Sequence, residues 1–333
     1  MSALNQGPTG VSRLLSPQEI AVSAGDQAPF LRLPERTSVY ADRALRLRQL
    51  AAGHAMRDFL LFVADLADAQ HVLLQQMPAL HLPDAVTLGE AAGSGRPPLP
   101  VEAVGLDPPW REVLRNLLRA IQPRLAASPA LNVLRSLQAA DDEHLDRQAD
   151  RLLAGEMLGL DFGAAPLIAA ALQVCWTHEV LEVQRRFGDV RPFGRVVDAT
   201  RCPCCGSRPT SSIVRIGDAA GYRYLHCSLC ATQWHMVRIK CTHCESTKGI
   251  YYLQLEPIAG AAAAATAAAP GAVQLECCEE CDHYLKIVHM ERDYQVEPVA
   301  DDLASLTLDI LVSDTGRRKH GVDLMLPFAE GDQ

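Results

Sequence analysis

The sequence predicts an α+β protein: an N-terminal helical domain, then two rubredoxin-like, zinc-ribbon modules, then a C-terminal helix. Alanine and leucine are abundant while aromatic residues make up only 5%, which favours helix over most of the chain. From Val196 onward, short β-branched runs bounded by turn formers alternate with cysteines, and such runs behave as strands. Ten of the eleven cysteines fall between Cys202 and Cys281, which indicates a dedicated metal-binding part.

Length and composition indicate an ordinary soluble globular protein of two or three domains, with 333 residues, 48% hydrophobic and 21% charged. The net charge of −9 argues against a general nucleic-acid binder, because phosphate neutralisation needs clustered Lys and Arg. The N-terminus has no signal-peptide core or twin-arginine pair. The longest apolar run, Phe162 to Trp176, is too short for a membrane span. We therefore expect a cytoplasmic protein without membrane insertion, whose cysteines are thiols or metal ligands.

The first 190 residues are expected to form an arm and a helical domain. Residues 1–35 lack sustained periodicity and are expected to be a mobile arm, within which the apolar segment Pro29–Pro34 docks onto the body. Residues 36–190 are expected to be the helical domain. Apolar residues recur at helical spacing from Thr37 to Gln76, and Gly53 marks a break between two helices.

Further helices follow a long connection. Residues 79–107 are rich in Pro and Gly and predict a long loop. Helical patterning resumes at Pro108, since proline suits the first turn of a helix. One further helix is expected over Ser128–Leu153 and another over Ala165–Arg186. Within the last of these, Cys175 is expected to be a buried core residue.

The remaining residues are expected to hold the two modules and the C-terminal helix. Residues 191–240 are assigned to the first rubredoxin-like module and residues 241–297 to the second. The alanine-rich stretch 257–271 is an insertion into the second module, without chemistry of its own. Helical spacing returns in residues 298–333, which are expected to be a C-terminal helix and tail.

Four Cys-x-x-Cys pairs supply the candidate metal ligands. A gap of two residues lets both thiolates of a tight turn point at one ion, and two turns complete a tetrahedral shell of four sulfurs. Such a shell suits zinc or a single iron of rubredoxin type. Strand-forming residues lie between the first and second pairs and between the third and fourth, so we expect two sites in series, each built from consecutive pairs. The eight cysteines are Cys202, Cys205, Cys227, Cys230, Cys241, Cys244, Cys278 and Cys281.

Other uses of these residues fit the pattern less well. The spacing differs from that of iron–sulfur ferredoxins, and a thioredoxin-like site needs one pair rather than four. Cys204 and Cys277 adjoin the pairs and are alternative ligands, although the regular spacing favours the eight. Nearby, His226, His235 and His243 are either hydrogen-bond donors to the sulfurs or surface residues, and we expect surface residues.

The sequence predicts that the chain is not an enzyme. A site closed by four cysteines has no open position for water or substrate, so it is structural or transfers electrons. The chain also lacks a phosphate-binding glycine loop, a GxSxG motif, an HExxH motif and a convincing pair of catalytic acids.

Several segments together resemble the formate dehydrogenase accessory protein family, FdhE. They are CPCCGSRP, RYLHCSLCATQWHMVRIKCTHC, CEECDHYLKI, VEPVADDLASLTLDIL, PFLRLP and AALQVCWTH. The resemblance extends from about Pro29 to Phe328. It implies a cytoplasmic maturation factor, required for formate dehydrogenase activity, that binds the catalytic subunit during assembly before export. It also implies two rubredoxin-like sites holding iron, with the eight cysteines of the four pairs as ligands.

Two other functions stay open from the residues alone. A zinc-ribbon nucleic-acid-binding protein is favoured by the local excess of Lys and Arg in residues 201–255, and a redox protein by mononuclear iron sites. The four-sulfur geometry accepts iron and zinc alike. The strip Gln233–Lys240 is a candidate partner surface, because Trp234 and Met236 stand beside cations. The alternative is that Trp234 packs in the core of the ribbon.

Overall fold

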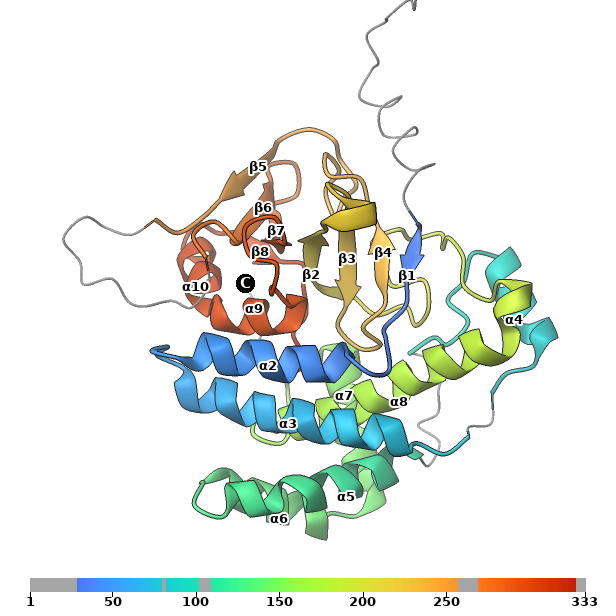
Figure 1. The fold of residues 1–333 in the computed structure, drawn as a ribbon, viewed down its shortest axis with the longest axis vertical. Helices are drawn as coiled ribbons and strands as arrows, with labels where there is room; N and C mark the ends of the chain where they lie inside the picture. Colours follow the sequence, from blue (N-terminus) through green and yellow to red (C-terminus); the bar gives the residue numbers. More distant parts are fainter. Residues whose placement is uncertain (1–28, 80–81, 102–108, 257–268, 328–333) are drawn as a thin grey trace, which may run out of the picture.

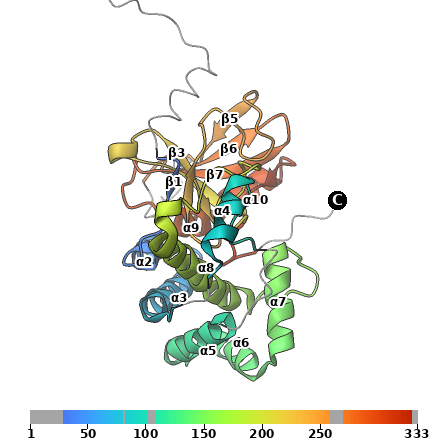
Figure 2. The ribbon, with the colours of Figure 1, turned by 90° about the vertical axis from the view of Figure 1, so that its right-hand side faces the viewer.

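The molecule has a helical layer and a sheet layer, joined by a short C-terminal segment (Figures 1 and 2). We describe it from a computed structural model, in residues 29–79, 82–101, 109–256 and 269–327. The helical layer comes from the first half of the chain and the sheet layer mostly from the second. An N-terminal helical part followed by a part that mixes helix and sheet confirms the predicted fold class. Within the part of the chain that the structure describes, no helix has the length and apolar character needed to cross a membrane.

One long helix, α8 (Ala165–Phe187), is the centre of the helical layer. Nearly every residue from Ala165 to Val183 is buried, as expected for a helix that is apolar on all sides. Cys175 is among them, which confirms its prediction as a core residue. The surrounding helices are α2 (Val39–Ala51), α3 (Arg57–Gln76), α4 (Ala85–Gly93), α5 (Pro109–Ile121), α6 (Ala130–Ala139) and α7 (Asp142–Ala154), with 3-10 turns at Gln122–Leu125 and Gly188–Val190.

The helices differ from the sequence prediction in two places: one helix was not predicted, and one predicted helix is two. The expected loop 79–107 contains α4, whose N-terminus is capped by Asp84 through a hydrogen bond from the amide of Thr87. The expected single helix Ser128–Leu153 is interrupted at Ala140, because Asp141 adopts an extended conformation and caps α7 by accepting from the amide of His144. The predicted break at Gly53, by contrast, is confirmed: its φ is 73° and it lies between α2 and α3.

The described residues form one sheet of eight strands, in the order β1-β4-β3-β2-β7-β6-β5, with β8 paired to β7. Leu31 of β1 pairs antiparallel with Trp234 of β4, so the predicted docking of Pro29–Pro34 onto the body is confirmed. Residues 1–28 of the expected arm and residues 257–268 of the expected insertion lie outside the described residues. The strands are β1 (Leu31–Arg32), β2 (Pro209–Val214), β3 (Arg223–Cys227), β4 (Gln233–His235), β5 (Ile250–Leu253), β6 (Val273–Cys278), β7 (His283–His289) and β8 (Arg318–Lys319), with a 3-10 turn at Gly217–Ala219.

The two expected modules share this sheet. Strands β2, β3 and β4 form an antiparallel group, and β5, β6 and β7 form another. Parallel pairing of β2 with β7, for example Ser212 opposite Ile287, joins the groups edge to edge. The modules therefore follow one another in the chain, but their strands are hydrogen-bonded into a single sheet.

The C-terminal segment forms two short helices where one was expected. They are α9 (Pro298–Ala304) and α10 (Leu306–Ser313). They are separated at Ser305, whose hydroxyl donates to the carbonyl of Asp301. The carboxylate of Glu297 caps α9 by accepting from the amides of its first turn. The helices separate where the backbone of Ser305, at φ −107° and ψ 28°, leaves the helical conformation.

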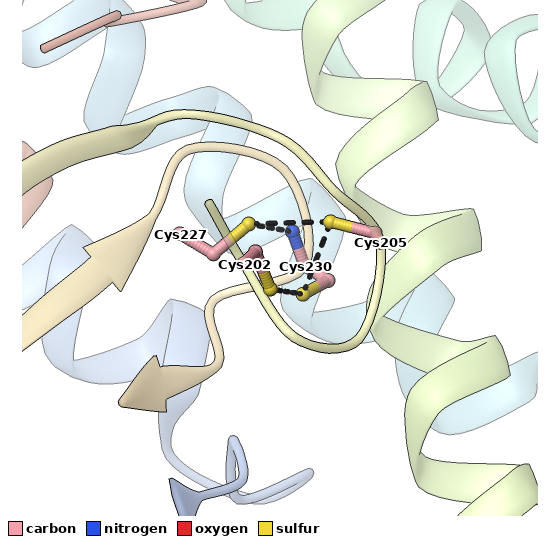
Figure 3. Close-up of side chains that lie close together, drawn as sticks. All are labelled: Cys202, Cys205, Cys227 and Cys230. Carbon is pink, nitrogen blue, oxygen red and sulfur yellow. Dashed lines mark hydrogen bonds between the residues drawn. The ribbon is translucent and has the colours of Figure 1, made fainter. Parts of the chain in front are cut away.

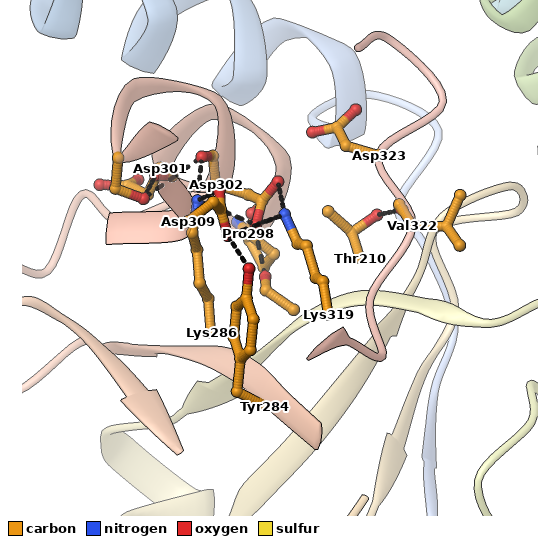
Figure 4. A network of polar contacts seen from close by, with 12 residues as sticks. Thr210, Tyr284, Lys286, Pro298, Asp301, Asp302, Asp309, Lys319, Val322 and Asp323 are labelled. Carbon is orange, nitrogen blue, oxygen red and sulfur yellow. Dashed lines mark hydrogen bonds and ion pairs between the residues drawn. The ribbon is translucent and has the colours of Figure 1, made fainter. Parts of the chain in front are cut away.

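Buried ion pairs fix the C-terminal segment to both layers. Arg46 of α2 makes a bidentate contact with Asp301 of α9, at 2.7 and 3.0 Å. Lys286 of β7 is fully buried and lies 2.6 Å from Asp309 and 3.4 Å from Asp302 (Figure 4). Because buried charges are tolerated only when paired, these contacts specify how the segment docks.

Candidate metal centres

The first cysteine group lies in two facing turns at one end of β2 and β3 (Figure 3). Cys202 and Cys205 precede β2, whereas Cys227 ends β3 and Cys230 follows in the next turn. The Sγ–Sγ distances are 3.6 Å for Cys202–Cys230, 3.4 Å for Cys205–Cys227 and 3.7 Å for Cys205–Cys230. All four Sγ atoms lie within 4.8 Å of one another and all four residues are buried.

This geometry fits one tetrahedral ion. Metal–sulfur bonds of about 2.3 Å place tetrahedral sulfurs about 3.8 Å apart. The amides of Leu229 and Cys230 also point at Cys227 Sγ, at 3.4 Å each. Amides aimed at a sulfur stabilise a thiolate, so the turn is arranged for a metal-bound cysteine.

The first group is embedded in the main core of the molecule. Its cysteines share one hydrophobic cluster with the residues of α8. The side chain of Gln173 on α8 donates to the carbonyl of Ser228 at 2.7 Å, inside the second cysteine turn. The amides of Leu99 and Val101 donate to the carbonyls of Cys204 and Cys205, in the first turn. The second turn is thus held by α8 and the first by residues 99–101, which lie between α4 and α5.

The second group is built in the same way but lies nearer the surface. The Sγ–Sγ distances are 3.7 Å for Cys241–Cys281 and 3.8 Å for Cys244–Cys278, and all four Sγ atoms lie within 4.8 Å of one another. Cys244 is exposed and Cys281 is half-buried. The structure therefore joins the first pair with the second and the third with the fourth, as the spacing predicts.

The two spare cysteines stand outside these tetrahedra. Cys204 is buried beside the first group and accepts a hydrogen bond from the Thr232 hydroxyl at 3.6 Å, and burial raises the pKa of its thiol well above the usual value. Cys277 points into a separate cluster with Leu275 and Tyr284, and burial raises its thiol pKa too. Neither belongs to a described group of four sulfurs.

The prediction of surface histidines is wrong for two of the three. His226 and His235 are buried in the sheet, and burial lowers the pKa of His226 to about 3. His243 is exposed, as predicted. Exposure could not be judged from the sequence, because it depends on which strands pair.

Sequence reasoning missed two histidines beside the second group. His283 stacks on His243 with ring centroids 3.6 Å apart, and His320 meets the same ring edge-on at 5.2 Å. The nitrogens of His243 and His283 lie within 4.8 Å of Cys281 Sγ, so Cys281 belongs to two potential donor sets. His283 could have been found, since it follows Cys281 by two residues, whereas His320 stands in the tail without any motif.

These histidines line a pocket of about 510 Å³ next to the second group. Burial and then the neighbouring His243 lower the pKa of His320 to about 3. The pocket gives the second group a solvent-facing side that the first group lacks. Its lining is Asp198, Thr200, Arg201, Arg208, His243, Cys244, Glu245, His283, Arg318, Lys319 and His320.

Three protein-family models together match nearly the whole chain. The family of FdhE N-terminal domains matches residues 28–189, that of FdhE central domains residues 201–238, and that of FdhE C-terminal domains residues 239–326. The chain belongs to the FdhE family. FdhE proteins are known as formate dehydrogenase accessory proteins.

Relatives of the FdhE family match over nearly their whole length. Protein FdhE of Salmonella typhimurium is 35% identical over 327 residues, covering 96% of this chain and 99% of its own. The FdhE homolog of Cronobacter sakazakii is 36% identical over 308 residues, covering 91% and 93%. The crystal structure of the FdhE protein from Pseudomonas aeruginosa superposes with a TM-score of 0.78 at 36% identity, covering 91% of this chain and all of that one.

The two apolar side chains that made the strip Gln233–Lys240 a candidate partner surface are buried in this FdhE chain. Trp234 is only 1% exposed, and its indole nitrogen donates to the carbonyl of Ala199 at 3.0 Å. Met236 is buried as well. Trp234 thus packs in the core, which was the alternative.

Two of the Lys and Arg side chains in residues 201–255, where such residues are in excess, form ion pairs with carboxylates of the same chain. Arg223 is fully buried and forms an ion pair with Glu276. Lys240 forms an ion pair with Glu245. These two side chains neutralise carboxylates instead of forming an open cationic surface.

Proposed function

We propose that this chain is a cytoplasmic maturation factor, required for the activity of formate dehydrogenase, that binds its catalytic subunit during assembly before export. We propose further that each group of four cysteines holds one metal ion, iron or zinc, so that the eight predicted ligands together bind two ions. The observation that carries the proposal is the pair of closed four-sulfur groups within a chain of which 96% aligns with an FdhE protein.

A binding role suits closed metal groups better than catalysis does. Four cysteine ligands leave the ion no position for a substrate, so neither centre offers hydrolytic chemistry. The first centre is enclosed by the main core, where an ion would cross-link two cysteine turns of the sheet layer that pack against the helical layer. Metal binding there contributes directly to folding free energy, because the unfolded chain has no preformed site.

Genetic deletion followed by complementation tests the function. In a host that depends on this gene, we expect deletion to abolish membrane formate dehydrogenase activity while transcription of the dehydrogenase genes persists. A plasmid copy of the wild-type gene should restore the activity. Unchanged activity in the deletion strain would contradict the proposal.

A pull-down tests the partner. Wild-type protein should retain the catalytic subunit of formate dehydrogenase from an extract, and variants with Cys→Ala at one pair in each site report whether the metal centres are needed. Loss of retention with Cys202→Ala/Cys205→Ala would link the first centre to partner binding through the fold. If the wild type does not retain the subunit, direct binding is wrong.

A further inference from the structure

A second pocket, of about 660 Å³, lies between α2, one face of the sheet and the loop 290–298. The sheet contributes β1, β3, β4 and the end of β2. The volume lies in the range of ligand-binding sites. No cysteine of either metal group lines it.

A chain of hydrogen bonds on the floor of the pocket fixes a donor there. Arg215 Nη1 donates to Gln233 Oε1 at 3.0 Å, and Gln233 Nε2 lies 3.4 Å from His226 Nδ1. Arginine can only donate, so the amide oxygen of Gln233 faces Arg215 and its NH₂ group faces His226. Nδ1 of His226 is therefore the acceptor, and its Nε2 carries the hydrogen.

Three polar atoms of the pocket have no hydrogen-bond partner among the described residues. They are His226 Nε2, Arg215 Nε and Gln49 Oε1. His226 is only 4% exposed, so water reaches it poorly. Buried polar atoms normally have partners, so the two donors and one acceptor left open in this cavity are available to a bound ligand.

The floor of the pocket is also positively charged. Within the described ranges, neither Arg32 nor Arg215 has a carboxylate within 4.0 Å. Burial and then the positive charge of Arg32 lower the pKa of Arg215, whereas the charge of Glu35 acts in the opposite direction. A carboxylate bound between the two guanidinium groups would offset their positive charge and accept from the open donors.

Large exposed side chains at the border of the pocket are accessible to other proteins. Leu45 is 56% exposed and Tyr294 71% exposed, although both border the cavity. Tyrosine, methionine and arginine are enriched at protein interfaces, and Met290 lines the same pocket. β1 is an edge strand of the described sheet, and such an edge offers backbone groups to an extended chain.

Carboxylates at the pocket limit the negative charge that a bound ligand can carry. Glu35 and Asp42 are exposed at the rim. Glu297 also lines the pocket, but its charge is paired with Arg43. A run of several acids would meet repulsion at the rim, whereas a single carboxylate flanked by apolar residues would not.

We propose that this pocket is the docking site for an extended polypeptide segment of the partner protein, which places one carboxylate between Arg32, Arg215 and His226 Nε2. Apolar side chains next to that carboxylate pack on Leu45 and Tyr294, and a backbone amide donates to Gln49 Oε1. The inference rests on the proposed function, because the partner is the catalytic subunit of formate dehydrogenase.

The test measures the affinity of the purified full-length, metal-loaded protein for the purified catalytic subunit. Arg215→Gln and Arg32→Gln keep the side-chain bulk and remove the charge, and each should weaken binding about tenfold or more. The matched control, Arg238→Gln, removes an exposed arginine outside the pocket and should leave the affinity unchanged. The metal content of each variant must equal that of the wild type, which separates loss of docking from loss of folding.

The outcomes separate the two proposals. If the wild type does not bind the subunit, the proposed function fails. If the wild type binds and the pocket variants bind equally well, the function stands and the docking site is wrong. If the pocket variants instead abolish self-association of this chain, the occupant is a second copy, and the docking site for the partner is also wrong. Tyr294→Ala should weaken binding with less dependence on salt than Arg215→Gln, since it removes apolar contact rather than charge.

Discussion

At the scale of single residues, geometry divides the cysteines into those expected to be ligands and those outside the two groups of four. Cys204 and Cys205 are neighbours in sequence, but only Cys205 lies within 4.8 Å of three other sulfurs of the first group. Cys204 instead packs against Thr232. Adjacent thiols of equal chemistry therefore have different expected roles.

Replacing these two neighbours separately gives the first prediction. Cys205→Ser should remove one metal ion per chain and destabilise the core, because the shell of the first centre loses a sulfur. Cys204→Ser should retain both ions. Metal content by elemental analysis of the purified variants checks this, and equal loss in both variants would assign Cys204 to the shell.

A buried carboxyl group gives a pH-dependent prediction. Burial and then the charge of Asp302 raise the pKa of Asp323 to about 8, from an ordinary value of 3.8 (Figure 4). Between these values the unfolded chain releases a proton that the folded chain keeps, so Asp323 lowers stability as pH rises. Asp323→Asn keeps the acceptor for the amide of Met325 and removes this effect.

The stability gained by Asp323→Asn over the wild type should therefore grow from pH 6 to pH 8, by about 1–3 kcal/mol. Urea unfolding at the two pH values measures it. A gain that is the same at both pH values would show that Asp323 has an ordinary pKa.

The sequence predicts which residues come together where short turns of the chain determine their positions. The tight Cys-x-x-Cys turns bring two sulfurs together regardless of the rest of the fold, so both groups could be predicted from spacing. The burial of His226 and the docking of Trp234 depend on strands that pair over long separations. Their exposure could not be predicted from neighbouring residues.

At the scale of elements, the two centres are held differently. The turns of the first are bonded to α8 and to residues 99–101. The second lies at the end of β6 and β7, with Cys244 exposed. We expect the second centre to open more readily, since local opening is favoured where few contacts hold a segment.

A chelator should therefore remove the metal in two phases. The faster phase should release one ion per chain, and Cys244→Ser should eliminate that phase while the slower one remains. Absorbance of a coloured chelator follows the release. Release of both ions in a single phase would contradict the difference between the centres.

The junction between α2 and α9 gives a stability prediction. Arg46 contacts Asp301 and also Asp293, at 2.9 Å, in a buried position. Arg46→Leu would leave two carboxylates without their cation and should cost about 3–5 kcal/mol. Arg57→Leu, which removes an exposed pair with Asp58, should cost no more than about 1 kcal/mol. Urea unfolding compares the two, and similar losses would show that the junction does not support the fold.

Helices could be predicted where the pattern of apolar residues along the chain is strong. The apolar helix α8 was predicted within one residue, because its burial on all sides is visible in composition. The helix α4 was missed, since its Pro- and Gly-rich surroundings resemble a loop. The division of α9 from α10 was also missed, because it depends on the backbone conformation of a single residue, Ser305.

At the scale of the whole molecule, the sheet and the ion pairs make one body from parts that the sequence shows as consecutive. The parallel pairing of β2 with β7 joins residues more than seventy positions apart, for example Ser212 and Ile287. No local pattern encodes such a pairing. The first metal centre stands where this sheet meets the helical layer, so metal binding and the global fold are expected to be coupled.

The central claim, two closed four-sulfur metal centres in one accessory protein, is tested most directly by the mass of the intact wild-type chain under non-denaturing conditions. The account predicts the mass of the full chain plus two metal ions, iron or zinc, with a loss of one ion in Cys205→Ser and one in Cys244→Ser. A wild-type chain that carries no metal, or only one ion at full loading, would contradict it.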